Sequence, residues 1–225
     1  MKQILITGAG RGIGEQLAHI LSGENKVLVL TRNISSLSKL NHTNLIAEQF
    51  DLDGNDVSQR AAQILKRHHF NPDVVINNAG QLVNKPFEKI TRSEMEAVYR
   101  VNVFGLMEIC QAVVPLLKPG SHIVNIGSMG GFQGSAKFSG LSVYSSSKAA
   151  VASFSECLAE ELKEKKISVN CLALGAAQTE MLSEAFPGYQ APVSAKEMAT
   201  FIADFSLKAH QWINGKVIPV SLSTP

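Results

Sequence analysis

Two side chains in the second half of the chain form a pair that could transfer a proton. Tyr144 and Lys148 are four residues apart, so on a helix both side chains lie on the same face. An ammonium group about 5 Å from a phenol favours the phenolate by about 3 kcal/mol at an effective dielectric constant of about 20. Because this corresponds to about two pKa units, we expect Lys148 to lower the pKa of Tyr144 toward the pH at which a general acid or base works best.

A serine and an asparagine could complete this catalytic set. Ser128 follows the apolar run 122–126, which we expect to end at the carboxyl edge of a parallel sheet, where such folds bind ligands. Its hydroxyl could donate to a carbonyl oxygen and hold that oxygen against Tyr144. Asn102 interrupts an apolar helical stretch, so its amide needs hydrogen-bond partners inside the fold.

A glycine-rich turn follows the first apolar run. Its spacing is G-x-x-x-G-x-G, with Gly8, Gly12 and Gly14 at the glycine positions. Glycines let the backbone turn sharply and approach a pyrophosphate, whose charge meets the unpaired N–H groups of the following helix. A glycine-rich turn can form without a ligand, but its place between a strand and a helix favours a dinucleotide. The residues that we expect to contact it are Gly8, Gly10, Arg11, Gly12, Ile13 and Gly14.

The end of the second apolar run indicates which dinucleotide is bound. An acidic residue there would accept hydrogen bonds from a free ribose 2′-hydroxyl, but the chain reads Leu-Thr-Arg-Asn over 30–33. Arg32 and Arg11 could instead grip a 2′-phosphate with paired, charged hydrogen bonds. The sequence therefore favours NADP(H) over NAD(H).

Short apolar runs alternate with helix-length segments along the chain. The runs are 4–6, 27–30, 44–50, 73–76, 122–126, 167–172 and 216–220. The segments long enough for crossover helices are 12–18, 34–40, 56–69, 92–117, 144–165 and 194–207. This order predicts an α/β fold, a parallel sheet with helices on both faces. The uninterrupted apolar runs agree, because such a sheet is buried on both sides.

With Asn-Asn-Ala-Gly over 77–80 and Tyr-Ser-Ser-Ser-Lys over 144–148, the chain resembles the short-chain dehydrogenase/reductase family from residue 2 to about 220. The resemblance implies a Rossmann-type, doubly wound, seven-stranded parallel sheet with strand order 3-2-1-4-5-6-7. It implies that Ser128, Tyr144 and Lys148 are catalytic, with Asn102 supporting a water beside the lysine. It also implies further cofactor contacts, at Asp51, Leu52, Asn78, Ala79, Gly80, Tyr144, Lys148, Gly175 and Thr179.

Some features depart from the family pattern. Leu174 precedes Gly175 where the family usually has proline, and the segment after Thr179 leaves room only for a short substrate lid. The chain end lacks the Asp-Gly-Gly often found there. In the family, helices corresponding to 103–117 and 144–165 form a paired interface, so the resemblance implies a homodimer or homotetramer.

Composition and charge limit the kinds of protein and partner that we expect. The 225 residues are 45% hydrophobic and 18% charged, which fits one folded domain over residues 1–225. A formal charge of +2 gives no reason to expect nucleic acid or an anionic membrane as partner. Three cysteines without CxxC spacing and six histidines without ligand spacing suggest neither a disulfide framework nor a metal site. We expect a cytoplasmic protein, because the N-terminus has no signal-peptide core and no clean membrane span appears.

These observations predict an NADPH-dependent oxidoreductase that reduces a ketone or aldehyde to an alcohol by hydride transfer, with Tyr144 as general acid/base. A 3-ketoacyl-carrier-protein reductase is one alternative, for which a basic patch beside the cleft is expected. A catalytically silent NADP-binding sensor is another, although a sensor would need only the glycine turn and the arginines. An isomerase or epimerase on the same fold is a third, but related epimerases tend to be longer.

Overall fold

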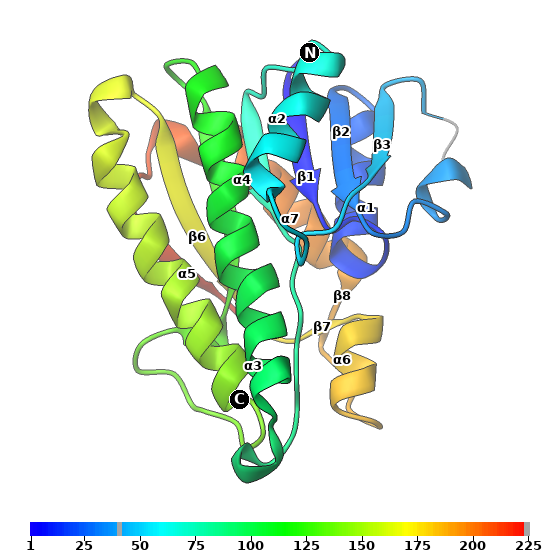
Figure 1. The fold of residues 1–225 in the computed structure, drawn as a ribbon, viewed down its shortest axis with the longest axis vertical. Coiled ribbons are helices and arrows are strands. Elements are labelled where there is room, and N and C mark those ends of the chain that lie inside the picture. The colour runs from blue at the N-terminus through cyan, green and yellow to red at the C-terminus, as the bar shows by residue number, and fades with distance from the viewer. Residues whose placement is uncertain (40–41, 223–225) are drawn as a thin grey trace.

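The computed structural model describes residues 1–39 and 42–222 and contains a seven-stranded parallel sheet (Figure 1). The strand order is β3-β2-β1-β4-β5-β6-β9, which confirms the predicted Rossmann-type order. Every predicted apolar run overlaps one of these strands. Their bounds are β1 Gln3–Thr7, β2 Lys26–Thr31, β3 Leu45–Gln49, β4 Val74–Asn77, β5 His122–Ser128, β6 Ser168–Leu174 and β9 Val217–Val220.

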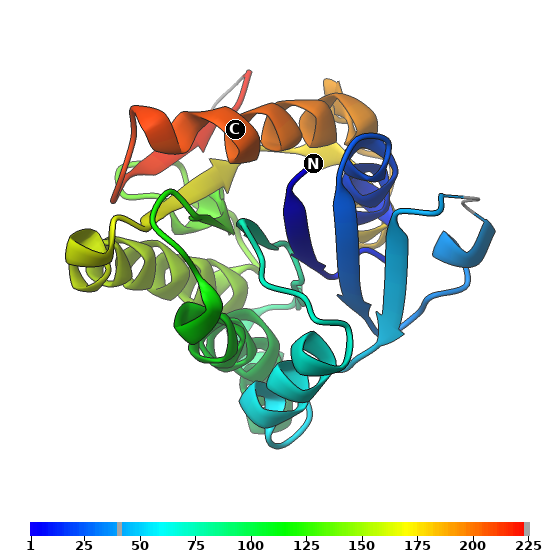
Figure 2. The same cartoon turned by 90° about the horizontal axis from the view of Figure 1, so that it is seen from above.

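Helices cover both faces of the sheet, as Figure 2 shows from above. Helices α1 (Gly12–Ser22) and α7 (Ala195–Lys208) pack on one face, and α2 (Val57–Arg67), α4 (Leu106–Val113) and α5 (Ser142–Glu161) pack on the other. Alternate residues of a strand supply the two cores: Ile4 and Ile6 face α1 and α7, whereas Leu5 faces the opposite helices. Burial on both sides explains why the strands are continuously apolar.

The predicted helix 92–117 is one helical rod with a widened turn in its middle. It begins as α3 (Arg92–Tyr99), continues through the π-helix η3 (Arg100–Gly105) into α4, and ends as the 3-10 helix η4 (Val114–Leu116). The rod from 92 to 116 is long and apolar enough to cross a membrane by length and composition, but 56% of its most apolar window is buried within the fold, as in the core helix of a folded domain. The π-turn contains Asn102, and π-turns inside helices often mark functional sites.

The predicted helix over 34–40 is wrong as far as the chain is described. Only a 3-10 helix, η1 (Leu37–Lys39), forms there, and residue 40 lies outside the described residues. Side chains compete with helical hydrogen bonds in this segment, because the Asn33 Oδ1 accepts from the Ser35 N–H and the Ser36 hydroxyl donates to the Gly10 carbonyl oxygen.

The segment after β6 contains elements that the sequence patterns did not predict. Strands β7 (Ala177–Gln178) and β8 (Val193–Ser194) form a second, two-stranded parallel sheet, and the helix α6 (Glu180–Ala185) lies between them. The β7–β8 pair closes the base of a lid that carries α6. The remaining short 3-10 helices are η2 (Phe87–Lys89), η5 (Met129–Gly131), η6 (Lys163–Lys165) and η7 (Ala209–Gln211).

Candidate active site

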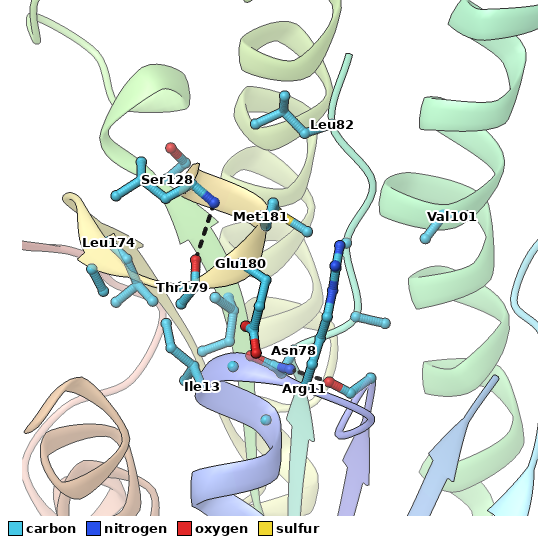
Figure 3. Close-up of a pocket in the computed structure, with 18 of the residues that line it drawn as sticks. Arg11, Ile13, Asn78, Leu82, Val101, Ser128, Leu174, Thr179, Glu180 and Met181 are labelled. Carbon is cyan, nitrogen blue, oxygen red and sulfur yellow. Dashed lines mark hydrogen bonds between the residues drawn. The ribbon is translucent and has the colours of Figure 1, made fainter. Parts of the chain in front are cut away.

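A cleft of about 760 Å³ runs along the carboxyl edge of the sheet, between the glycine-rich turn and the lid (Figure 3). The catalytic candidates Ser128, Tyr144 and Lys148 line it, whereas Asn102 does not. Every residue predicted to contact the cofactor lies on its wall: Gly8, Gly10, Arg11, Gly12, Ile13, Gly14, Arg32, Asp51, Leu52, Asn78, Ala79, Gly80, Tyr144, Lys148, Gly175 and Thr179.

The glycine-rich turn has a backbone that only glycine adopts readily. Gly8 and Gly12 have positive φ values of +72° and +60°. A Cβ on Gly14 would lie 2.2 Å from the Gly8 carbonyl oxygen, so the turn and the start of α1 are packed backbone to backbone. Arg11 is the N-cap of α1 but its side chain gives no capping hydrogen bond. The first N–H groups of α1 therefore suit the anionic pyrophosphate of a dinucleotide.

The segment after β4 braces this turn. The Asn78 side-chain amide donates to the Gly8 carbonyl oxygen at 2.7 Å, and the Ala79 N–H donates to the Thr7 hydroxyl at 3.2 Å. Beneath them, the Asn77 amide donates to the Asn125 side-chain oxygen at 2.9 Å and so ties β4 to β5. These residues hold the glycine-turn end of the cleft in shape.

The end of the cleft beside β2 carries an exposed arginine. Arg32 is exposed just beyond the end of β2, and within residues 1–39 and 42–222 its guanidinium has no hydrogen-bond or ion-pair partner. Asp51 and Leu52 line the same end, and the Asp51 carboxylate accepts from the Asp53 N–H at 3.0 Å. Arg11, the other predicted phosphate contact, instead pairs with Glu184 on the lid helix.

Tyr144 and Lys148 project from the first two turns of α5 toward Ser128 at the end of β5. Lys148 is 3% exposed, and its ammonium donates to the Ile126 carbonyl oxygen at 2.7 Å. That contact leaves its Nζ 6.0 Å from the centroid of the Tyr144 ring. The two side chains share a helix face, as their spacing predicts.

Glycines in the loop after Ser128 let it lie directly on α5. A Cβ on Gly131 would lie 2.5 Å from the backbone nitrogen of Ala149, and one on Gly130 would lie 2.7 Å from the Ser145 hydroxyl. Any larger side chain there would push Ser128 away from the helix that carries Tyr144. The loop therefore positions the serine relative to the tyrosine.

The prediction that Lys148 lowers the pKa of Tyr144 is wrong for this structure. Burial raises the pKa of Tyr144, and only a hydrogen bond with Ser128 opposes that rise. Burial lowers the pKa of Lys148 to about 8, with a small opposing effect from Cys171. Desolvation dominates because Lys148 is buried and Tyr144 is half-buried in the wall of the cleft. The phenol thus stays protonated at neutral pH and is suited to donate a proton.

Asn102 lies behind the cleft, fully buried in the π-turn. Its side-chain amide donates to the Ser147 hydroxyl and to the Gln81 carbonyl oxygen, both at 2.9 Å, and its side-chain oxygen accepts from the Gln81 N–H at 2.7 Å. The Ser147 hydroxyl in turn donates to the Tyr144 carbonyl oxygen at 2.7 Å. Asn102 therefore connects the segment after β4 to the first turn of α5.

The loop after β6 keeps a fixed path without the usual proline. A Cβ on Gly175 would lie 2.4 Å from the Ser221 hydroxyl, and the Gly175 N–H donates to the Val220 carbonyl oxygen at 2.8 Å. Thr179 then caps α6 by accepting from the Leu182 N–H at 3.2 Å. Figure 3 shows Thr179 on the lid segment above the glycine-rich turn.

The substrate end of the cleft is apolar. Phe138, from the loop between β5 and α5, lines it together with the lid residues Met181, Leu182 and Phe186. Sequence reasoning missed Leu82, Leu141 and Tyr189 on this wall and Glu180 beside the glycine turn. No motif marks these four positions, because the lid and loop path that brings them together depends on tertiary packing. Among the described residues, no group of three His, Cys, Asp or Glu side chains could hold a metal ion.

Comparison with known proteins agrees with this fold and identifies the family. The family model for short chain dehydrogenase matches residues 2–190. The chain belongs to the short-chain dehydrogenase/reductase family, whose members are oxidoreductases that use a nicotinamide cofactor on small molecules.

Three known proteins are similar to this chain over almost its whole length. Versicolorin reductase stcU from Emericella nidulans is 30% identical over 256 aligned residues, covering 97% of this chain and 94% of the relative. The Pseudomonas aeruginosa RhlG/NADP complex is 27% identical with a TM-score of 0.87, covering 98% of this chain and 94% of that one. A structure named as ribose-5-phosphate isomerase from Brucella melitensis is 28% identical with a TM-score of 0.86, covering 97% and 90%.

Proposed function

We propose that this protein is an NADPH-dependent reductase of ketones or aldehydes. The observation that carries the proposal is the arrangement of one cleft: Ser128, Tyr144 and Lys148 meet at one end, and Arg32 stands at the ribose position of the other, where no acidic residue follows β2. A dinucleotide laid over the glycine turn would reach both ends. The similar RhlG structure holds NADP, which supports the choice of cofactor.

Each side chain has a distinct part in this reaction. The cofactor supplies the hydride. Ser128 donates a hydrogen bond to the substrate carbonyl oxygen and fixes it beside the Tyr144 hydroxyl. Tyr144, kept protonated by burial, gives its proton to that oxygen as negative charge develops there. Lys148 presents its ammonium to the ribose next to the nicotinamide, and Asn102 positions the start of α5 through Ser147.

The substrate in this proposal is an uncharged, apolar carbonyl compound. The charged side chains that line the cleft are Arg11, Arg32, Asp51, Lys148 and Glu180. All but Lys148 belong to the cofactor end or the glycine turn, and the buried Lys148 ammonium donates to the Ile126 carbonyl oxygen and is assigned to the ribose. A charged substrate would thus lose its hydration against Phe138, Met181 and Phe186 without gaining a counter-ion.

The side chains in and around the cleft weigh against three alternatives. An isomerase of a sugar phosphate, the activity named for one similar structure, would need a cation at the substrate end. A carrier-protein reductase would need free basic groups at the cleft mouth, but the Lys85 ammonium pairs with Glu94 and the Lys137 ammonium donates to the Phe132 carbonyl oxygen. A catalytically silent sensor would not need Ser128 to lie beside Tyr144, because cofactor binding alone does not require these two hydroxyl groups.

A screen of carbonyl compounds tests the proposal. NADPH oxidation is followed for neutral aryl and alicyclic ketones and aldehydes, for keto acids and for an acyl thioester. We expect turnover with neutral apolar members, and its absence with every compound would refute the proposed activity. In parallel, fluorescence titration should give an NADPH affinity about tenfold or more above that for NADH, reduced by Arg32→Ala. Equal affinities would refute the cofactor assignment.

A further inference from the structure

The lid helix α6 is tied to the glycine-rich turn by a two-pronged ion pair. The Arg11 Nη1 lies 2.5 Å from one carboxylate oxygen of Glu184, and the Arg11 Nη2 lies 3.0 Å from the other. Both side chains keep about half of their surface exposed, at 51% and 62%. The pair joins segments that are far apart in the sequence and lie on the two sides of the cleft.

Two more contacts place α6 across the cleft. At its start, the Glu180 carboxylate lies 3.4 Å from where a Cβ of Gly12 would stand, and its charge adds to that of Glu184 around Arg11. At its end, the Asn84 amide donates to the Ala185 carbonyl oxygen at 2.7 Å. Figure 3 shows Arg11 rising from the glycine turn and Glu180 descending toward it. The lid therefore rests on the turn over which the cofactor phosphates would pass.

The guanidinium of Arg11 has two competing partners. Its fork matches a carboxylate or a phosphate, and the fork formed by Nη1 and Nη2 is used on Glu184, so a second oxyanion meets only the Nε edge of a guanidinium whose charge Glu184 already neutralises. A 2′-phosphate can engage that fork only by displacing Glu184. A cofactor with a free 2′-hydroxyl makes no such demand, because a hydroxyl does not compete with a carboxylate for an arginine.

We propose that Glu184 is a specificity-determining residue: it holds Arg11 on the lid and thereby reduces the advantage that a 2′-phosphate gives to NADPH over NADH. The inference rests on the proposed use of NADPH. Arg32, which has no partner in the described parts of the chain, provides the basal preference, and Glu184 sets how much Arg11 adds to it. Binding of a 2′-phosphate also frees α6 from the glycine turn, whereas binding of NADH leaves the pair in place.

The test compares cofactor affinities of wild type and Glu184→Gln, which keeps the side-chain size and removes the charge. Dissociation constants are measured for NADPH and NADH, and for adenosine 2′,5′-bisphosphate and adenosine 5′-monophosphate as probes of the 2′-phosphate alone. Because an exposed ion pair is worth little, we expect a tightening of about two- to fivefold for the two 2′-phosphate ligands only. The effect should shrink in high salt.

A matched control removes a comparable exposed ion pair elsewhere. Asp204 pairs with Lys208 at 2.8 Å on α7, with side chains 66% and 71% exposed, and Asp204→Asn should change no affinity. In an Arg11→Gln background, Glu184→Gln should lose its effect, since the two side chains act on each other. A merely structural role of Glu184 in the lid would instead shift NADPH and NADH equally and would persist without Arg11.

The outcomes separate this inference from the proposed function. If wild type prefers NADPH and loses part of that preference with Arg11→Gln, but Glu184→Gln leaves the NADPH to NADH ratio unchanged, the role of Glu184 is refuted while the proposed cofactor stands. If wild type shows no preference for the 2′-phosphate and Arg32→Ala and Arg11→Gln leave it unchanged, the cofactor assignment itself is refuted. A NADPH to NADH affinity ratio that Glu184→Gln raises in the wild-type background and leaves unchanged in the Arg11→Gln background supports the inference.

Discussion

Acid should destabilise this protein through one buried histidine, His122, at the start of β5. The side chain is fully buried, and its Nδ1 donates to the Ser206 carbonyl oxygen at 2.9 Å while its Nε2 accepts from the Asn170 amide at 3.0 Å. Both ring nitrogens are therefore satisfied only in the neutral imidazole. Burial, helped by the positive charges of His210 and Lys2, lowers the pKa of His122 to about 4, although the hydrogen bond to the Ser206 carbonyl oxygen opposes the shift.

The size of the effect follows from that pKa. An unfolded chain protonates this imidazole near pH 6.5, whereas the folded chain does so only near 4. The unfolded state thus binds the extra proton between these values, and stability is lost as the pH falls from 6.5 to 4. At about 1.4 kcal/mol per pH unit, the total contribution is about 3 kcal/mol, fully present above pH 6.5.

Urea unfolding at several pH values measures the contribution of His122 to the free energy of unfolding. His122→Gln keeps a polar side chain that does not titrate, so the slope of unfolding free energy against pH between 6.5 and 4 should fall by up to about 1.4 kcal/mol per unit relative to wild type. His69→Gln removes an exposed histidine at the end of α2 and serves as the control, with the wild-type slope expected. Equal slopes for wild type and His122→Gln would refute the reasoning.

Three further predictions concern the site and the assembly. Gly14→Ala should destabilise the fold by about 1–3 kcal/mol in denaturant titrations and weaken NADPH binding, because its Cβ would lie 2.2 Å from the Gly8 carbonyl oxygen; unchanged stability and affinity would contradict the packing argument. Lys148→Met should lower kcat and also raise the dissociation constant for NADPH, since the ammonium is expected to hold the ribose; a change in kcat alone would exclude that contact. Light scattering should give a dimer or tetramer, and a 24.2 kDa monomer at micromolar concentration would refute the expected assembly.

Much of the fold was predictable because its signals are local. Seven apolar runs became the seven strands, and the glycine spacing located the turn at Gly8 to Gly14. The i, i+4 spacing placed Tyr144 and Lys148 on one face of α5. Each of these features depends on residues that are neighbours in the sequence.

The errors arose where distant parts of the chain meet. The pKa of Tyr144 is governed by burial and not by its spacing from Lys148, and burial is a tertiary property. The lid helix α6 is six residues long, which is too short for a hydrophobic repeat to predict it. It is held by contacts with distant residues, such as that of Glu184 with Arg11. The segment 34–40 has helix-like length, but its serines bond to nearby backbone and to the glycine turn instead.

The proposed function requires that hydride pass from the cofactor to a carbonyl carbon. NADPH carrying deuterium at both C4 positions is incubated with the best substrate from the carbonyl screen, and the alcohol is analysed by mass spectrometry. We predict one deuterium on the carbinol carbon with wild type, and a rate about 10²–10⁴-fold lower with Tyr144→Phe, whose NADPH affinity should remain nearly unchanged. An alcohol without deuterium, or a Tyr144→Phe enzyme that works at the wild-type rate, would contradict the account.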